Sequence, residues 1–108
     1  MATYTNTSYA AKNVGTSAST LTTVAASTTA AISSLIVTNT TSSPITTSVY
    51  FTRSAVDYYL VYQATVPVGG SLECIQGNRV VLIASDALKV LNSAATSGDA
   101  IASVLLAV

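Results

Sequence analysis

The stretch ITTSVYFT, residues 45–52, decides the fold class of this chain. Its side chains separate into two alternating sets, one of them mostly apolar. The first set is Ile45, Thr47, Val49 and Phe51, and the second is Thr46, Ser48, Tyr50 and Thr52. A period of two with β-branched and aromatic residues is typical of a strand that turns one face toward a core. The stretch therefore predicts a half-buried β-strand.

Short β-branched runs continue on both sides of this strand, with turn residues between them. Seven further strands are expected at residues 21–25, 32–39, 58–63, 72–76, 79–84, 87–92 and 100–108. The turns include Thr40–Pro44, Val66–Gly70 and Gly77-Asn78. About eight short strands at this spacing predict a single antiparallel β-sandwich of the jelly-roll or immunoglobulin-like type. Helix is expected only as a short turn within residues 25–32 or 94–104, because threonine and valine lose rotamer freedom in helices.

The N-terminal segment differs in character from the rest of the chain. Residues 1–19 are small and polar, and Tyr4 and Tyr9 are their only aromatic side chains. The chain is thus expected to divide into an extended N-terminal arm, residues 1–19, and a β-sandwich domain, residues 20–108. The arm is either disordered or ordered on a neighbouring subunit, with the two tyrosines as anchors.

Charge is scarce in the 108 residues. Only 7% are charged, four basic against four acidic, while Ser and Thr make up about 30%. Scattered basic residues argue against binding to nucleic acid or to an anionic membrane, and no apolar run approaches the ~20 residues of a membrane span. The N-terminal residues lack the pattern of a signal peptide, which predicts synthesis in the cytoplasm. A net charge of zero favours self-association, so other subunits are expected to cover much of the surface.

The sequence offers no catalytic or metal-binding constellation. The absence of histidine removes the Ser/His/Asp and Cys/His arrangements and the commonest zinc ligand. The four carboxylates are Asp57, Glu73, Asp86 and Asp99. Nothing pairs them, and the three aspartates lie in or beside predicted turns. Cys74 alternates in phase with Leu72, which predicts a buried, unreactive thiol. We therefore expect no enzyme, no cofactor and no metal.

The tyrosines offer the strongest candidates for a contact surface. In Tyr58-Tyr59 one ring must point inward and the other outward, so at least two of the rings in this region are expected to be exposed. They are either a stacking platform for sugars or a packing surface for another subunit, and the scarcity of charge favours the second. The candidate partner-interface residues are Tyr4, Tyr9, Tyr50 and Tyr59. Arg53 and Asp57 flank the predicted hairpin loop, residues 53–57, and are expected to form a surface ion pair.

Three runs carry a resemblance to a known class of proteins. They are LIVTNTTSSPIT at residues 35–46, VPVGGSL at 66–72 and VVLIASDALKV at 80–90. Over residues 20–108 the chain resembles small all-β structural proteins of bacteriophage virions, of the capsid decoration (cement) type or the small tail-component type. Ala84-Ser85-Asp86 stands where such proteins usually have Ala-Gly-Asp.

The resemblance implies a structural role in a tailed-phage particle. The chain would be a capsid decoration protein that binds and stabilises the assembled shell. It would act as a small homo-oligomer, with a trimer favoured, on the major capsid protein or another virion protein. The implied location is the virion, after synthesis in the host bacterial cytoplasm. The alternative is a tail or fibre component whose tyrosines bind a glycan or receptor on the cell surface. Such families have no catalytic motif.

Overall fold

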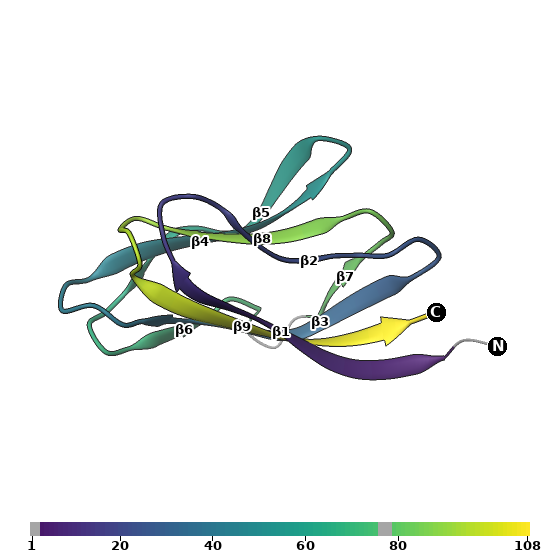
Figure 1. Ribbon diagram of the computed structural model, residues 1–108, viewed down its shortest axis with the longest axis horizontal. Coiled ribbons are helices and arrows are strands. Elements are labelled where there is room, and N and C mark those ends of the chain that lie inside the picture. Colours follow the sequence, from purple (N-terminus) through teal and green to yellow (C-terminus); the bar gives the residue numbers. More distant parts are fainter. Residues whose placement is uncertain (1–2, 76–78) are drawn as a thin grey trace.

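The computed structural model describes residues 3–75 and 79–108 of the chain. Its strands are β1 (Tyr4–Val14), β2 (Ser19–Thr23), β3 (Thr29–Asn39), β4 (Ile45–Arg53), β5 (Val56–Val66), β6 (Ser71–Glu73), β7 (Val80–Leu82), β8 (Ala87–Asn92) and β9 (Gly98–Ala107). They build an elongated molecule with extents of 49 × 26 × 21 Å (Figure 1). The predicted Gly77-Asn78 turn and the last residue of the strand predicted at 72–76 lie outside the described residues.

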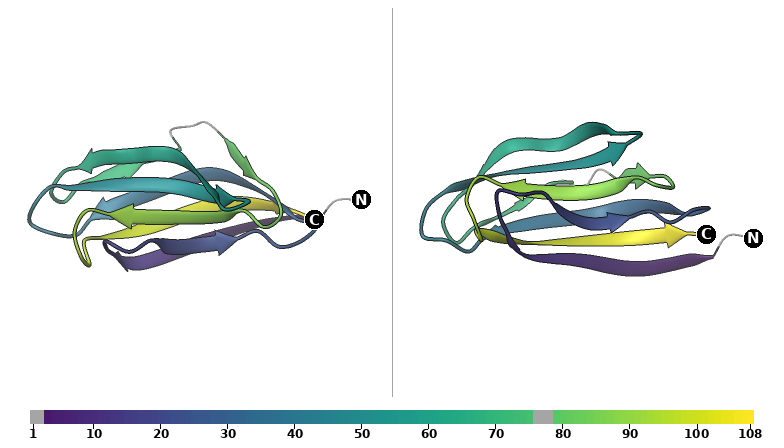
Figure 2. Two further views of the ribbon diagram at one scale, coloured as in Figure 1. Left: turned by 90° about the horizontal axis from the view of Figure 1, so that it is seen from above. Right: turned by 45° about the horizontal axis from the view of Figure 1, so that its top comes forward.

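The strands form two antiparallel sheets, which confirms the predicted β-sandwich. One sheet has the order β1-β9-β3-β6, with β7 also paired to β3, and the other has the order β2-β8-β4-β5. Figure 2 shows the sheets from two further sides. The described part of the chain holds nine strands, where eight were expected. No helix occurs in residues 3–75 and 79–108, because the stretches in which a helical turn was allowed enter β3 and β9 instead.

Strand β3 contributes several of the largest fully buried side chains of the core. Ile32, Leu35 and Val37 are all inaccessible to solvent. They do not follow a strict period of two, because the pairing of β3 with β9 shifts register between Ile32 and Ser34. Such a bulge turns residues on both sides of it toward the same face. From the facing sheet, Leu88 and Val90 of β8 join the same hydrophobic cluster.

The predicted free N-terminal arm is wrong for residues 4–14, which form strand β1 of the sandwich. β1 pairs with β9 without a shift from Tyr4 to Ala11, and Val14 at its end is fully buried. Figure 2 shows β1 beside β9 at the margin of its sheet. The segment is extended, as expected, but its ladder of backbone hydrogen bonds to β9 places it within the domain. Its side chains are small and mostly polar, so hydrophobicity hardly alternates along the segment. The sequence pattern therefore did not predict a strand here.

The hairpin β4–β5 is longer than predicted and its far end stands away from the rest of the molecule (Figure 1). The loop predicted at residues 53–57 shrinks to Ser54 and Ala55, because Thr52 still pairs with Asp57 and Arg53 with Val56. Ser54 and Ala55 have φ values of 52° and 63°. Two central residues with positive φ match the twist of a two-residue hairpin.

Asn39 organises the connection from β3 to β4. The side chain is buried, and its Nδ2 donates to the carbonyl oxygens of Ser43 at 2.8 Å and Val66 at 3.1 Å. Its Oδ1 accepts from the backbone N–H of Thr41 at 2.9 Å and from the Thr41 hydroxyl at 2.7 Å. A fully bonded buried amide fixes a loop at little cost in desolvation. The Asn-Thr-Thr sequence is therefore a structural device in this fold.

Candidate interaction surface

One face of the β4–β5 hairpin carries a cluster of three tyrosine rings. The Tyr59 ring centroid lies 5.0 Å from that of Tyr50, with planes tilted by 41°, and 4.9 Å from that of Tyr62, with planes at 85°. Tyr50 is covered to 8% exposure, whereas Tyr59 and Tyr62 remain 47% and 63% exposed. Burial, followed by the nearby carboxylate of Asp57, raises the pKa of the Tyr50 hydroxyl. The cluster therefore has a buried base and an open top.

The opposite face of the hairpin carries a second aromatic pair. Tyr58 stacks on Phe51 with centroids 5.3 Å apart and planes 21° apart, and the guanidinium carbon of Arg53 lies 5.1 Å from the Phe51 ring centroid. Tyr58 and Tyr59 point to opposite faces, as the period of a strand predicts, since they lie opposite Phe51 and Tyr50 of β4. The expectation that one of the two rings points inward is wrong. Both are half exposed, because β5 is an edge strand of its sheet. We call residues 50–62 the tyrosine hairpin.

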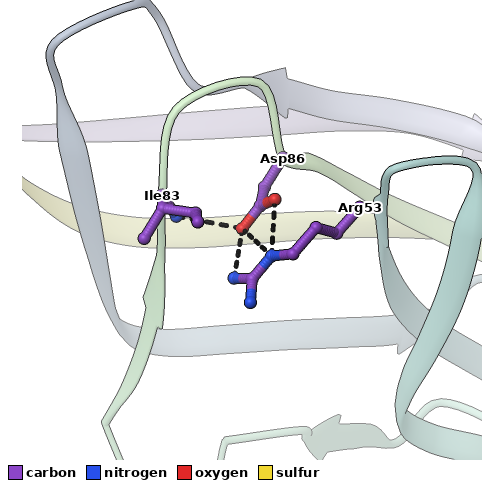
Figure 3. A network of polar contacts seen from close by, with 3 residues as sticks. All are labelled: Arg53, Ile83 and Asp86. Atoms are coloured by element: carbon purple, nitrogen blue, oxygen red, sulfur yellow. Dashed lines mark hydrogen bonds and ion pairs between the residues drawn. The ribbon is translucent and has the colours of Figure 1, made fainter.

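An ion pair attaches the tyrosine hairpin to the turn between β7 and β8 (Figure 3). Arg53 Nη2 donates to Asp86 Oδ2 at 2.6 Å, and its Nε donates to Oδ1 at 2.9 Å. The Asp86 side chain is 1% exposed against 38% for Arg53, and its Oδ2 also accepts from the backbone N–H of Ile83 at 2.9 Å. The hydrogen bond from Arg53 lowers the pKa of Asp86 below its ordinary value, although burial opposes the shift. Asp86 is therefore an ionised anchor for the hairpin.

The expected ion pair between Arg53 and Asp57 is wrong. Asp57 instead accepts a hydrogen bond from the Thr52 hydroxyl at 2.7 Å. The longer strands hold Asp57 opposite Thr52 in the ladder, while the Arg53 side chain reaches the neighbouring turn. Sequence proximity suggested the wrong carboxylate, since the true partner is 33 positions away.

The turn that contains Asp86 has Ser85 at the position where the virion proteins that the sequence resembles usually have the glycine of Ala-Gly-Asp. Ser85 has a φ of 74°, a conformation that glycine adopts without strain. The backbone N–H of Asp86 donates to the carbonyl oxygen of Ile83 at 3.1 Å and closes the turn. The predicted Ser85-Asp86 turn is thus confirmed, with the strain at Ser85 offset by the contacts of Asp86.

The four tyrosines predicted for the partner interface lie on both sheets. Tyr50 and Tyr59 meet in the tyrosine hairpin, while Tyr4 and Tyr9 lie on β1 of the other sheet. Tyr4 is 67% exposed, and Tyr9 packs partly against the core. Sequence reasoning omitted Tyr62 from the candidates, although it is as exposed as Tyr4. The register shift between the pairs Tyr50–Tyr59 and Val49–Val61 adds one residue to β5. The added residue turns Tyr62 to the same face as Tyr59, which no regular alternation predicts.

The residues with potential chemistry are inert or dispersed. Cys74 is buried, as predicted, and burial, with a smaller effect of Glu73, raises the pKa of its thiol to about 12. The thiol is therefore neutral and poorly nucleophilic near neutral pH. Across residues 3–75 and 79–108, no group of three or more Cys, Asp or Glu side chains is close enough to hold a metal ion. The same residues contain no helix long and apolar enough to cross a membrane.

Comparison with known proteins identifies similar folds only. No protein-family model matches the sequence, and no curated protein matches it. Among solved structures, the chain is similar to one from Bacillus endospore appendages, described as a novel family of disulfide-linked pili, with a TM-score of 0.55 and 13% identity. That match covers 97% of this chain and 86% of the other.

Chains from infectious bursal disease virus, strains Gx and Gt, match more weakly. Their TM-scores are 0.47 and 0.46, with 12% and 11% identity. This chain spans about a third of their length, 31% and 32%. At such identities the likeness to the pilus chain concerns the fold alone.

Proposed function

We propose that this protein is a structural subunit of a multi-copy particle, and specifically a capsid decoration protein that binds and stabilises a bacteriophage shell. The observation that carries the proposal is the tyrosine hairpin. It forms one edge of its sheet, its far end projects from the molecule, and Tyr58, Tyr59 and Tyr62 are 48%, 47% and 63% exposed. Exposed aromatic clusters on soluble domains are typical of protein interfaces.

The conformation of the hairpin is already fixed in the free protein. The Arg53–Asp86 pair holds its far end, and the rings pack on one another at about 5 Å. Rings that are already ordered lose little conformational entropy on binding, so more of their buried area appears as affinity. A groove on the shell protein would take the open top of the cluster.

Two further observations support an assembly subunit. With only 7% charged residues and a net charge of zero, the surface has little of the repulsion that keeps free monomers apart. The similar fold in the Bacillus appendages belongs to proteins that form pili, so a sandwich of this kind is compatible with repeated packing. A small homo-oligomer on the particle, with a trimer as the expectation from sequence, fits both observations.

The alternative is a tail or fibre module that stacks sugars on its tyrosines. The exposed rings and the nearby carboxylate of Asp57 favour it. Sugar platforms, however, need a flat ring face, and Tyr62 stands at 85° to Tyr59. An edge-to-face cluster presents a ridge, which suits a protein groove better than a sugar ring.

Titration of stripped particles tests the proposal. Particles that carry this chain are freed of it and incubated with Tyr59→Ser/Tyr62→Ser. Loss of two anchors, at about 1–3 kcal/mol for each ring, should weaken binding by a factor of about 30 or more. The matched control is Val68→Ser, a similarly exposed apolar residue in the loop after β5, which should bind as the parent does.

Electron microscopy of the native particle supplies the second measurement. Density for the chain on the shell, with the hairpin at a capsid contact, supports the decoration role. Density on the tail, together with binding to a glycan array that Tyr59→Ser/Tyr62→Ser abolishes, would replace it with the receptor-binding role. Unchanged shell occupancy of the double variant would remove the hairpin from the contact.

A further inference from the structure

Strand β1 leaves one side of its backbone unpaired within the described residues. Thr3 and Val108 exchange two backbone hydrogen bonds, both 2.9 Å long, and the ladder to β9 continues without a shift to Ala11. Because hydrogen-bonded and non-bonded pairs alternate in antiparallel sheets, odd-numbered residues of β1 bond to β9. The N–H and C=O groups of Tyr4, Asn6, Ser8 and Ala10 therefore point to the open side.

The other edge strands of the two sheets, in contrast to β1, are too short or too irregular to pair readily with another strand. β6 and β7 are three residues long, and β2 has five residues with a register shift. β5 is long but shifts register twice and contains Gln63 at a φ of 49°. Short strands and bulges are the devices that keep edges from pairing. β1 has neither over residues 4–11, nor any proline, and no charged residue before Lys12.

We propose that β1 is a self-association edge, on which a second copy of this chain docks its own β1 in antiparallel orientation around a two-fold axis at Thr7. This register places Asn6 opposite the second copy's Ser8, and Tyr4 opposite its Ala10. All four open residues then pair, giving about eight backbone hydrogen bonds. A two-fold axis at Ser8 would instead pair Tyr4 with the second copy's Lys12. Lys12 lies next to the register shift after Ala11, and its side chain forms an ion pair with Asp99 at 3.3 Å, so this register is less favourable.

The side chains around this axis complement one another. A shallow hollow of about 220 Å³ lies beside Ala10, lined also by Lys12, Asp99 and Ile101. In the proposed register the exposed ring of Tyr4 from one copy lies over this hollow of the other, and the reverse. Such reciprocal contacts are the property of a two-fold interface. The ring would also cover Ile101, which is 53% exposed and pairs with Ala10 in the ladder.

A contact of this size is weak in solution. A single strand edge with one ring on each side lies at the low end of interface areas, below ~1,200 Å². We expect a dissociation constant in the micromolar range, which becomes effective when many copies lie close together on a particle. A two-fold edge contact gives a dimer, so a trimer would need a second, different contact.

Complementary charges on the edge test the proposal. In Asn6→Lys/Ser8→Lys and in Asn6→Asp/Ser8→Asp, like charges face each other across the axis and each variant alone should be monomeric. An equimolar mixture should recover the dimer, because opposite charges then meet. Thr65→Lys/Val68→Lys is the control with the same added charge on other exposed residues, and it should dimerise as the parent does. Sedimentation equilibrium up to several hundred micromolar measures the parent, the two charged variants, their mixture and the control.

A second variant separates loss of the contact from loss of the fold. Tyr4→Ser changes a 67% exposed side chain and should raise the dissociation constant about tenfold, while the circular dichroism spectrum stays that of the parent. A parent that is monomeric throughout, a dimer that survives in both charged variants, or an unchanged constant in Tyr4→Ser would overturn the proposal. Particle binding through the tyrosine hairpin is measured separately and does not depend on this result.

Discussion

Gly98 is the position where an added methyl group should damage the fold most among the glycines that the structure describes. It opens β9 and pairs with Val14 on one side and Asn39 on the other. A Cβ at Gly98 would lie 2.5 Å from the carbonyl oxygen of Thr38 and 2.9 Å from Nδ2 of Asn92. The first of these neighbours is backbone held in the β3 ladder, so the strands must separate to admit the methyl group.

The expected cost follows from that contact. Overpacking a core costs about 1–3 kcal/mol, and a clash with fixed backbone falls at the upper end, so Gly98→Ala should lower the free energy of unfolding by about 3 kcal/mol. For a domain of this length the loss corresponds to a melting temperature lower by roughly 12–24 °C. Urea unfolding followed by tyrosine fluorescence measures the free energy, and calorimetry measures the temperature.

Gly69→Ala is the matched control. Gly69 has a φ of 68°, and nothing lies within 4 Å of the position that its Cβ would take. The control therefore suffers only the backbone strain of a left-handed alanine, about 1 kcal/mol. If Gly98→Ala proves no more destabilising than Gly69→Ala, the close approach of β9 to β3 described above is incorrect.

Three further predictions concern the hairpin, its anchor and the cysteine. Ser54→Asn/Ala55→Gly should raise the free energy of unfolding by about 1 kcal/mol in urea titrations, because both positions have positive φ; a loss of stability would contradict the turn. The pKa of Asp86 is held below its ordinary 3.8 by the hydrogen bond from Arg53, so unfolding takes up a proton in acid. Stability measured by calorimetry should fall as the pH drops below about 4, and Asp86→Asn should flatten this dependence. Cys74 should resist a thiol reagent at pH 8 until the chain unfolds, and Cys74→Ser should cost about 1–3 kcal/mol; rapid labelling of the native protein would show that the thiol is exposed.

The sandwich was predictable because its central strands alternate clearly. ITTSVYFT at residues 45–52 has Val49 and Phe51 two positions apart, and ALKVLN at 87–92 has Leu88 and Val90 at the same spacing. Both stretches became strands of one sheet. β1 was missed because alternation between threonine, serine and alanine carries almost no contrast in hydrophobicity. Its pairing with β9 depends on a strand about 90 positions later, which no local pattern reveals.

The candidate surface shows the same division between local and distant information. The opposite faces of Tyr58 and Tyr59 follow from the period of a strand, whereas the exposure of both rings does not. Two distant features decide what those rings can do. The bulged pairing of β5 raises Tyr62 against Tyr59, and Asp86 reaches Arg53 from a different turn. Both features depend on strand partners, so a sequence can identify an aromatic segment while only the assembled sheets show which rings are held rigidly and left open to a partner.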